Sequence, residues 1–174
     1  MSRNEGSNHG SFEQLPDLVF GPLAGRPDAD WHRAPPGKWT PAQIAEHLAI
    51  GLDATSRRFA ERGERPPMTR RSRSAFARLA EFFILGLGWY PQGWFAAPEG
   101  TRPTARPDAS AVERKFRDSH ARFIDLARTL LPRRRADLFV KHPVLGDLTL
   151  EEWLRFHVVH SAHHVKQIRD RLAP

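Results

Sequence analysis

Apolar side chains recur at helical spacing over most of this chain, and that periodicity constrains the fold more than any other feature. In one stretch Ile44, Leu48 and Leu52 follow one another at intervals of four residues, which places them on one helix face. No segment alternates apolar and polar residues as a half-buried strand does. The sequence therefore predicts an all-α fold, a bundle of four long helices. The predicted helices cover residues 41–62, 76–87, 110–131 and 149–172.

Signals for helix ends accompany three of these segments. Thr40 followed by Gln43, and Thr149 followed by Glu152, have the spacing of a capping box, in which the two side chains satisfy free backbone N–H groups. Pro132 is expected to end the third helix, because proline disfavours the helical conformation in the residue before it.

A tail and several connectors complete the predicted organisation. Residues 1–11 are polar and are expected to form a flexible tail. With 174 residues in all, one domain over residues 12–174 is expected, opening with a short extra helix over 12–23. The apolar segment 76–87 is expected to form a more buried helix than 41–62. The long connectors are residues 25–38, 64–73, 89–108 and 133–148.

The chain has no cysteine, which excludes disulfides, Cys-ligated zinc, iron–sulfur clusters and a cysteine nucleophile. It begins with polar residues rather than a charged and then apolar signal pattern, and its most apolar stretch is too short to span a bilayer. We therefore expect a cytoplasmic protein with no membrane contact.

The formal net charge of +7 raises the question of nucleic acid. Of the 27 basic residues 23 are arginine, which is also what coding bias in a GC-rich genome produces. Two clusters, Arg70 to Arg73 and Arg133 to Arg135, lie at helix boundaries, where we interpret them as solvated surface. Nucleic acid is therefore an alternative partner rather than the expected one.

Histidine carries the strongest functional signal. The chain has nine histidines, and four of them fall between positions 157 and 164. His160 and His164 are four residues apart, about 40° around the helix, so both imidazoles can serve one metal ion. Ser161 follows His160 where the zinc-protease helix requires glutamate, which excludes that protease pattern.

A third ligand would have to come from another helix. His47 lies on the apolar stripe of its own helix, between Ile44 and Gly51, and is the best candidate. A hydrogen-bonded core histidine has the same sequence pattern, so spacing alone leaves both interpretations open.

Two blocks of the sequence resemble the DinB-like metal-binding superfamily. The first runs from Pro36 through Trp39-Thr40-Pro41 to Leu48, and the closing block runs from His142 through Trp153 to Ile168. The resemblance covers about Phe12 to Leu172. It implies a four-helix bundle that holds a divalent metal with three histidines, at the positions of His47, His160 and His164.

The resemblance also suggests a chemistry. Three neutral imidazoles leave coordination positions open, and zinc, nickel, iron or manganese accepts such ligands. Related proteins include transferases that use low-molecular-weight thiols, and proteins suspected of hydrolysis. We therefore expect an enzyme that activates a thiol or water toward a small substrate. Because the chain has no cysteine, the thiol would be a co-substrate.

Other residues of these blocks have two interpretations each. Gln167 and His142 are candidate catalytic residues, although Gln167 also fits an orienting or core role and His142 also fits a turn. Glu46 is expected to be solvated. His157 and His163 do not match ligand positions and are expected beside the ligands or on the surface.

The aromatic residues from Trp89 to Phe95 can cover the metal pocket or pack as core. Packing in the core is the favoured interpretation for Trp89, and both remain open for Trp94. Two hypotheses compete with the enzyme: a non-catalytic basic helical module that binds nucleic acid, and an inactive metal-binding stress-response protein. A homodimer is a further expectation.

Overall fold

The computed structural model describes residues 11–90 and 99–173. The expected tail, except for Ser11, and the side chains of Trp94 and Phe95 lie outside these residues. In chain order the elements are η1 (Phe12–Gln14), α1 (Leu15–Phe20), η2 (Gly21–Leu23), α2 (Asp28–Trp31), α3 (Pro41–Gly63), α4 (Ala75–Glu81), the π-helical η3 (Phe82–Gly86), η4 (Glu99–Thr101), α5 (Ala109–Arg134), β1 (Phe139–His142), β2 (Gly146–Thr149) and α6 (Leu150–Leu172).

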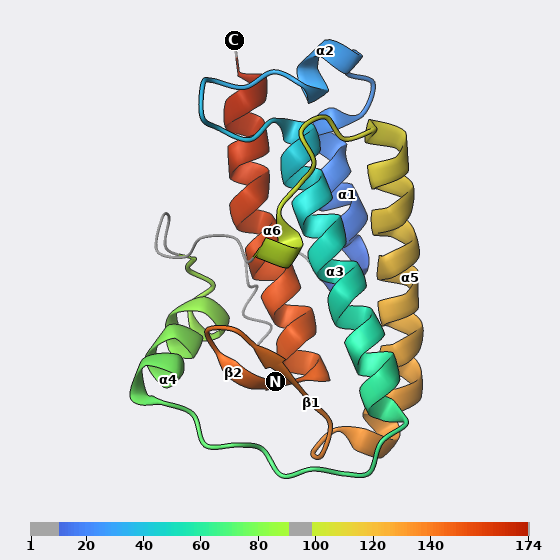
Figure 1. Cartoon of the computed structure of the whole chain (residues 1–174), viewed down its shortest axis with the longest axis vertical. Helices are drawn as coiled ribbons and strands as arrows, with labels where there is room; N and C mark the ends of the chain where they lie inside the picture. Colours follow the sequence, from blue (N-terminus) through green and yellow to red (C-terminus); the bar gives the residue numbers. More distant parts are fainter. Residues whose placement is uncertain (1–10, 91–98, 174) are drawn as a thin grey trace, which may run out of the picture.

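The three long helices α3, α5 and α6 run alongside one another, and α1 lies with them (Figure 1). Their facing sides carry fully buried apolar residues, and burial of each such side chain stabilises the fold by about 1.5–3 kcal/mol. The prediction of a helical bundle is confirmed. Representative core residues are Leu15, Ile44, Leu52, Phe59, Phe116, Phe123 and Ile168.

Both predicted capping boxes form. Thr40 Oγ1 accepts from the Gln43 backbone N–H at 3.2 Å, and Gln43 Oε1 accepts from the Thr40 N–H at 3.0 Å. Thr149 and Glu152 make the same pair of bonds at the start of α6. The two helices that carry the candidate ligands therefore begin where the sequence predicts.

The third predicted helix is longer than expected. α5 continues through Pro132 and ends at Arg134, so the prediction that Pro132 would end it is wrong. A proline has no backbone N–H and so removes one helical hydrogen bond, and α5 ends two residues after Pro132.

A short β-hairpin interrupts the connector 133–148, for which the sequence predicts no strand. β1 and β2 pair antiparallel, with Phe139 opposite Thr149 and His142 opposite Gly146. Each strand has only four residues, and their burial does not alternate along the strand, so the alternating pattern of a half-buried strand is absent. Gly146 adopts a positive φ of 77° where the turn enters β2.

The segment 76–87 is not the buried helix that was predicted. α4 and η3 lie beside the main bundle (Figure 1). Only Ala77, Ile84 and Leu85 of the two are buried. The apolar side chains of this segment point in all directions around its helix axis, and only those on one face pack against the rest of the protein. The interpretation of Trp89 as a core residue is wrong, because half of its side chain is exposed. The expected homodimer stays a prediction. The exposed fractions are 53% for Phe76, 56% for Leu79 and Phe82, 59% for Leu87 and 50% for Trp89.

The first arginine cluster is not free surface. Arg71 pairs with the carboxylate of Asp147, whose side chain is 2% exposed. Arg73 pairs with Glu81 and Glu152, and both Arg73 and Arg70 donate to the Asp147 backbone carbonyl. These bonds fasten the connector before α4 to the hairpin and to the start of α6.

In the part of the chain that the structure describes, no helix is both long and apolar enough to cross a membrane.

Candidate metal centre

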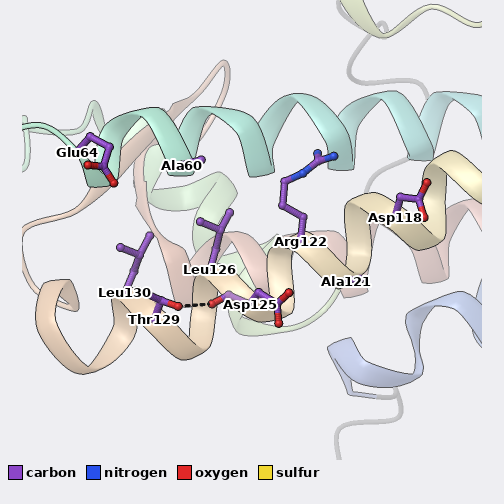
Figure 2. A pocket seen from close by; sticks show the side chains of 9 residues that line it. All are labelled: Ala60, Glu64, Asp118, Ala121, Arg122, Asp125, Leu126, Thr129 and Leu130. Carbon is purple, nitrogen blue, oxygen red and sulfur yellow. Dashed lines mark hydrogen bonds between the residues drawn. The ribbon is translucent and has the colours of Figure 1, made fainter.

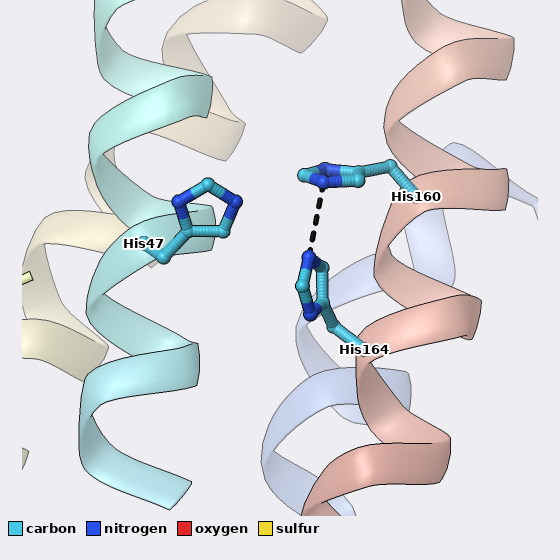
Figure 3. Close-up of side chains that lie close together, drawn as sticks. All are labelled: His47, His160 and His164. Atoms are coloured by element: carbon cyan, nitrogen blue, oxygen red, sulfur yellow. Dashed lines mark hydrogen bonds between the residues drawn. The ribbon is translucent and has the colours of Figure 1, made fainter. Parts of the chain in front are cut away.

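Three histidines from two helices converge on one point. His47 projects from α3, and His160 and His164 project from consecutive turns of α6 (Figure 3). One ring nitrogen of each lies within 4.8 Å of the others. The Nε2 atoms of His160 and His164 are 3.1 Å apart. The ring centroid of His47 lies 5.3 Å from the ring centroid of His160 and 5.1 Å from that of His164. The structure thus brings together all three residues proposed from the sequence.

Hydrogen bonds set the tautomers of two of these rings. His47 Nδ1 lies 2.8 Å from the backbone carbonyl of Thr101, and His164 Nδ1 lies 3.0 Å from Gln167 Oε1. Because both oxygens only accept, each Nδ1 carries the proton and each Nε2 keeps its lone pair. A lone pair on Nε2 is what a metal ligand needs.

Burial keeps the three imidazoles neutral. It lowers the pKa of His47, although the hydrogen bond to Thr101 acts in the opposite direction. It lowers the pKa of His164 to about 3, with help from His47. The pKa of His160 is also well below its ordinary value, because of burial and then its two histidine neighbours. Neutral imidazole is the form that binds metal.

The donor set fits a divalent transition metal. Imidazole nitrogen suits zinc, iron and nickel, whereas magnesium and calcium require oxygen ligands. Among the described residues the cluster consists of these three histidines without a carboxylate. Three protein ligands leave at least one coordination position open, which is the arrangement of catalytic rather than structural sites.

Gln167 follows His164 on the next turn of α6 and contacts both His163 and His164. Its Oε1 faces His164, and its Nε2 lies 3.2 Å from His163 Nε2. It therefore has the orienting position that the sequence left open, and a catalytic role stays a prediction. His163 is partly exposed and lies beside the cluster.

His142 is a turn residue in this structure. Its Nδ1 accepts from the N–H groups of Val144 and Leu145, both at 3.1 Å. Its ring centroid lies 4.5 Å from that of Phe156, which in turn stacks on His160 at 5.1 Å. Burial lowers the pKa of His142 to about 4. His142 is not brought into the three-histidine cluster, and its catalytic role stays a prediction.

His157 is a core residue, so of the two positions expected for it, beside the ligands or on the surface, the surface position is excluded. Its side chain is 4% exposed and packs against Phe123, Trp153 and Phe156. Its Nε2 is buried without a hydrogen-bond partner among the described residues. Burial lowers its pKa to about 3, with a smaller contribution from His142.

Two aromatic residues adjoin the cluster: Tyr90, from the segment expected either to cover the metal pocket or to pack as core, and Trp39, which was not named as a site residue. The Tyr90 ring centroid lies 5.3 Å from that of His160 and 4.9 Å from that of His163. Trp39, which belongs to the first resembling block, lies 5.1 Å from His47. The Trp89-to-Phe95 segment therefore contributes Tyr90 to the site.

The backbone of the connector before α5 also belongs to the site. Thr101 supplies the carbonyl that orients His47, and no sequence pattern reports a backbone acceptor. Glu46, expected to be solvated, accepts from the Thr104 N–H at 2.6 Å and from its hydroxyl at 3.0 Å. Gln43 donates to the carbonyls of Thr104 and Ala105. Three residues of α3 thus hold this connector beside the cluster.

A separate hollow of about 530 Å³ lies between α3 and α5 (Figure 2). None of the three histidines lines it, and Ala60 at its edge is about 20 Å along α3 from His47. The hollow is therefore not the chamber of the histidine cluster. Its lining consists of Ala60, Glu64, Asp118, Ala121, Arg122, Asp125, Leu126, Thr129 and Leu130.

The fold and the site define a four-helix-bundle protein with a three-histidine centre. Its sequence matches the DinB superfamily over residues 11–168. The chain belongs to the DinB superfamily. A search of the curated proteins finds no similar sequence.

Two solved structures share the fold. YfiT from Bacillus subtilis, described as a probable metal-dependent hydrolase with an unusual four-helix bundle topology, has a TM-score of 0.60 and 21% identity, over 98% of this chain and 90% of that chain. TT2238, a four-helix bundle protein, has a TM-score of 0.56 and 22% identity, over 91% of this chain and 93% of that chain. At these identities the likeness establishes the fold.

Proposed function

We propose that this protein is a metal-dependent enzyme that activates water, or the thiol of a small co-substrate, toward a small organic molecule. The observation that carries the proposal is the convergence of three neutral imidazoles within 4.8 Å. A structural histidine core does not require Nε2 of His47 and Nε2 of His164 both to carry a lone pair on the side that faces the other histidines. A metal centre does.

The protein residues have separable roles in this proposal. His47, His160 and His164 would hold the ion, while Thr101 and Gln167 orient two of the three rings. A divalent metal bound there would supply Lewis acidity, which lowers the pKa of a water or thiol ligand into the neutral range. The neutral imidazoles add no negative charge, so that acidity would be retained.

The surroundings of the cluster favour a substrate with an apolar part. Tyr90, Phe156 and Trp39 place their rings beside the three histidines. Aromatic walls with a few polar groups are typical of small-molecule sites. In hydrolysis, the water oxygen would bond to an electrophilic carbon while the bond to the leaving group breaks and the leaving group takes up a proton.

Thiol transfer is the second candidate at the same site. There the sulfur of the co-substrate would bond to carbon and displace the leaving group. The chain has no cysteine, so this sulfur must come from another molecule. YfiT is described as a probable hydrolase, and water is therefore the nucleophile we place first.

Activity assays with the protein loaded in turn with zinc, nickel, iron or manganese test the proposal. Aromatic esters and amides report hydrolysis, and an activated aromatic or alkyl halide with a low-molecular-weight thiol reports transfer. We expect turnover of one class by the wild type, its loss in His164→Ala and its retention in Lys166→Met, which changes an exposed residue of the same helix. Turnover that survives His164→Ala would contradict the proposal. Metal binding without turnover of either class would instead favour the inactive metal-binding protein.

The nucleic-acid alternative gains nothing from the first arginine cluster. Arg71 is engaged by Asp147, and Arg70 and Arg73 by Glu152. A phosphate backbone would have to compete with these carboxylates for the guanidinium groups. Binding to duplex or single-stranded DNA or RNA that weakens steeply with salt would be the result that revives this alternative.

A further inference from the structure

A row of four hydrogen-bonded side chains, His163, Gln167, His164 and His160, runs along α6 and includes two members of the histidine cluster. His163 Nε2 lies 3.2 Å from Gln167 Nε2, and Gln167 Oε1 lies 3.0 Å from His164 Nδ1. His164 Nε2 then points at His160 Nε2, 3.1 Å away. The i to i+4 and i to i+3 spacings of one helix face produce the row without help from another element.

The direction of each bond in the row follows from the chemistry of the amide. The carbonyl oxygen of Gln167 can only accept and its NH₂ group can only donate. His164 Nδ1 must therefore donate, and His163 Nε2 must accept. If the amide were reversed, its NH₂ would donate to His164 Nδ1, and the proton of His164 would move to Nε2. The orientation of one amide thus decides whether His164 presents a lone pair or a proton to the cluster.

We propose that Gln167 is a positioning residue that holds His164 in the Nδ1-protonated tautomer and so keeps its Nε2 available as a ligand. The proposal rests on the proposed metal centre only for what that lone pair serves. The tautomer itself is a property of the metal-free protein. His163 contributes by accepting from the amide NH₂, which favours the orientation that serves His164.

Gln167 is also the side chain through which this control can be tested. The corresponding bond to His47 comes from the backbone carbonyl of Thr101, which substitution of a side chain does not remove. Groups that orient metal-bound histidines typically change metal affinity 10–100-fold when they are removed. Gln167 is partly exposed, so a change there leaves the packed core intact.

The test compares Gln167→Met, which has a similar length but no hydrogen-bonding amide, with Gln167→Glu, whose carboxylate still accepts from His164. Lys166→Met is the matched control, because Lys166 is exposed on the same turn. Long-range ¹⁵N–¹H spectra of the metal-free proteins report which nitrogen of His164 carries the proton. Competition with a chelator for zinc reports affinity in a second, independent measurement.

We expect Nδ1-protonated His164 in the wild type, Gln167→Glu and Lys166→Met, and a mixture of tautomers or the Nε2-protonated form in Gln167→Met. Zinc affinity should fall about 10–100-fold in Gln167→Met and be retained in Gln167→Glu. An unchanged tautomer in Gln167→Met would overturn the proposal, as would a Gln167→Glu protein that behaves like Gln167→Met. A tautomer that follows these variants in a protein that binds no zinc would support the positioning role and overturn only the proposed metal centre.

Discussion

The backbone carbonyl of Thr101 lies 2.8 Å from Nδ1 of His47, and this contact joins the connector before α5 to the histidine cluster. The connector is held in place by α3 itself, since Glu46, the residue before His47, accepts from the Thr104 N–H and hydroxyl. The orientation of a candidate ligand therefore depends on residues that do not touch the cluster.

Glu46→Ala should loosen the connector without removing a ligand. Loss of the two bonds to Thr104 exposes its N–H, so hydrogen exchange at Thr104 should become faster and metal affinity should fall by up to about tenfold. Hydrogen-exchange mass spectrometry and chelator competition measure the two effects. Glu61→Ala, an exposed change on the same helix, is the control and should alter neither. Equal exchange at Thr104 in both variants would contradict this role of Glu46.

Leu85 and Leu79 should differ sharply in what they contribute to stability. Leu85 is 5% exposed and Leu79 is 56% exposed, although they lie six positions apart in one apolar segment. Leu85→Ala should lower the free energy of unfolding by about 2–4 kcal/mol, because it leaves a cavity. Leu79→Ala should change it by less than about 1 kcal/mol. Urea unfolding measures both, and similar losses would mean that α4 and η3 pack differently from this account.

Asp147 should stabilise the fold through Arg71. The hydrogen bonds from the Arg71 guanidinium hold the pKa of Asp147 below its usual value, against the effect of burial. Asp147→Asn should therefore cost about 1–3 kcal/mol at pH 7. A lowered carboxyl pKa stabilises in full only above the unfolded-state pKa of about 3.9, so the cost should shrink as the pH falls below that value and through the lower folded-state pKa. Asp125→Asn, on an exposed side chain, is the control and should stay within about 0.5 kcal/mol. Equal costs for the two variants would contradict a stabilising role of the Asp147 ion pair.

His157 should make the metal-free fold sensitive to mild acid. Its folded-state pKa is about 3, so below the ordinary value of about 6.5 the unfolded chain binds a proton that the folded chain does not. The free energy of unfolding therefore decreases as the pH is lowered, by about 1.4 kcal/mol per pH unit for this group. His157→Phe removes the proton site and the unpartnered Nε2. The variant should match or exceed the wild type at pH 7 and gain about 2 kcal/mol relative to it at pH 5. Unfolding curves with the same pH slope for both proteins would show that His157 does not carry the effect.

Helix positions and the three candidate ligands could be predicted because both depend on patterns between residues that are close in the sequence. The capping residues Thr40 and Thr149 mark the starts of α3 and α6, and the four-residue spacing of His160 and His164 puts them on one face. His47 followed from its place on an apolar stripe and from the family resemblance. These features need no knowledge of the tertiary structure.

What sequence could not predict depends on contacts between distant segments. Arg73 looks like a solvated charge until Glu81 and Glu152 are seen to surround it. Likewise every residue has a backbone carbonyl, and only the path of the folded chain brings that of Thr101 to His47. The sequence predicts more burial for the segment 76–87 than the structure has, because apolar content alone does not show which face of a helix packs.

The metal content of the protein, purified without an affinity tag, tests the central claim most directly. Elemental analysis should find about one divalent transition-metal ion per chain in the wild type and none in His160→Ala, with both proteins folded by circular dichroism. Added zinc should raise the unfolding temperature of the metal-free wild type but not of the variant, because only the protein that holds the ion gains stability from it. A folded wild type that contains no metal and is not stabilised by zinc, nickel, iron or manganese would contradict the account.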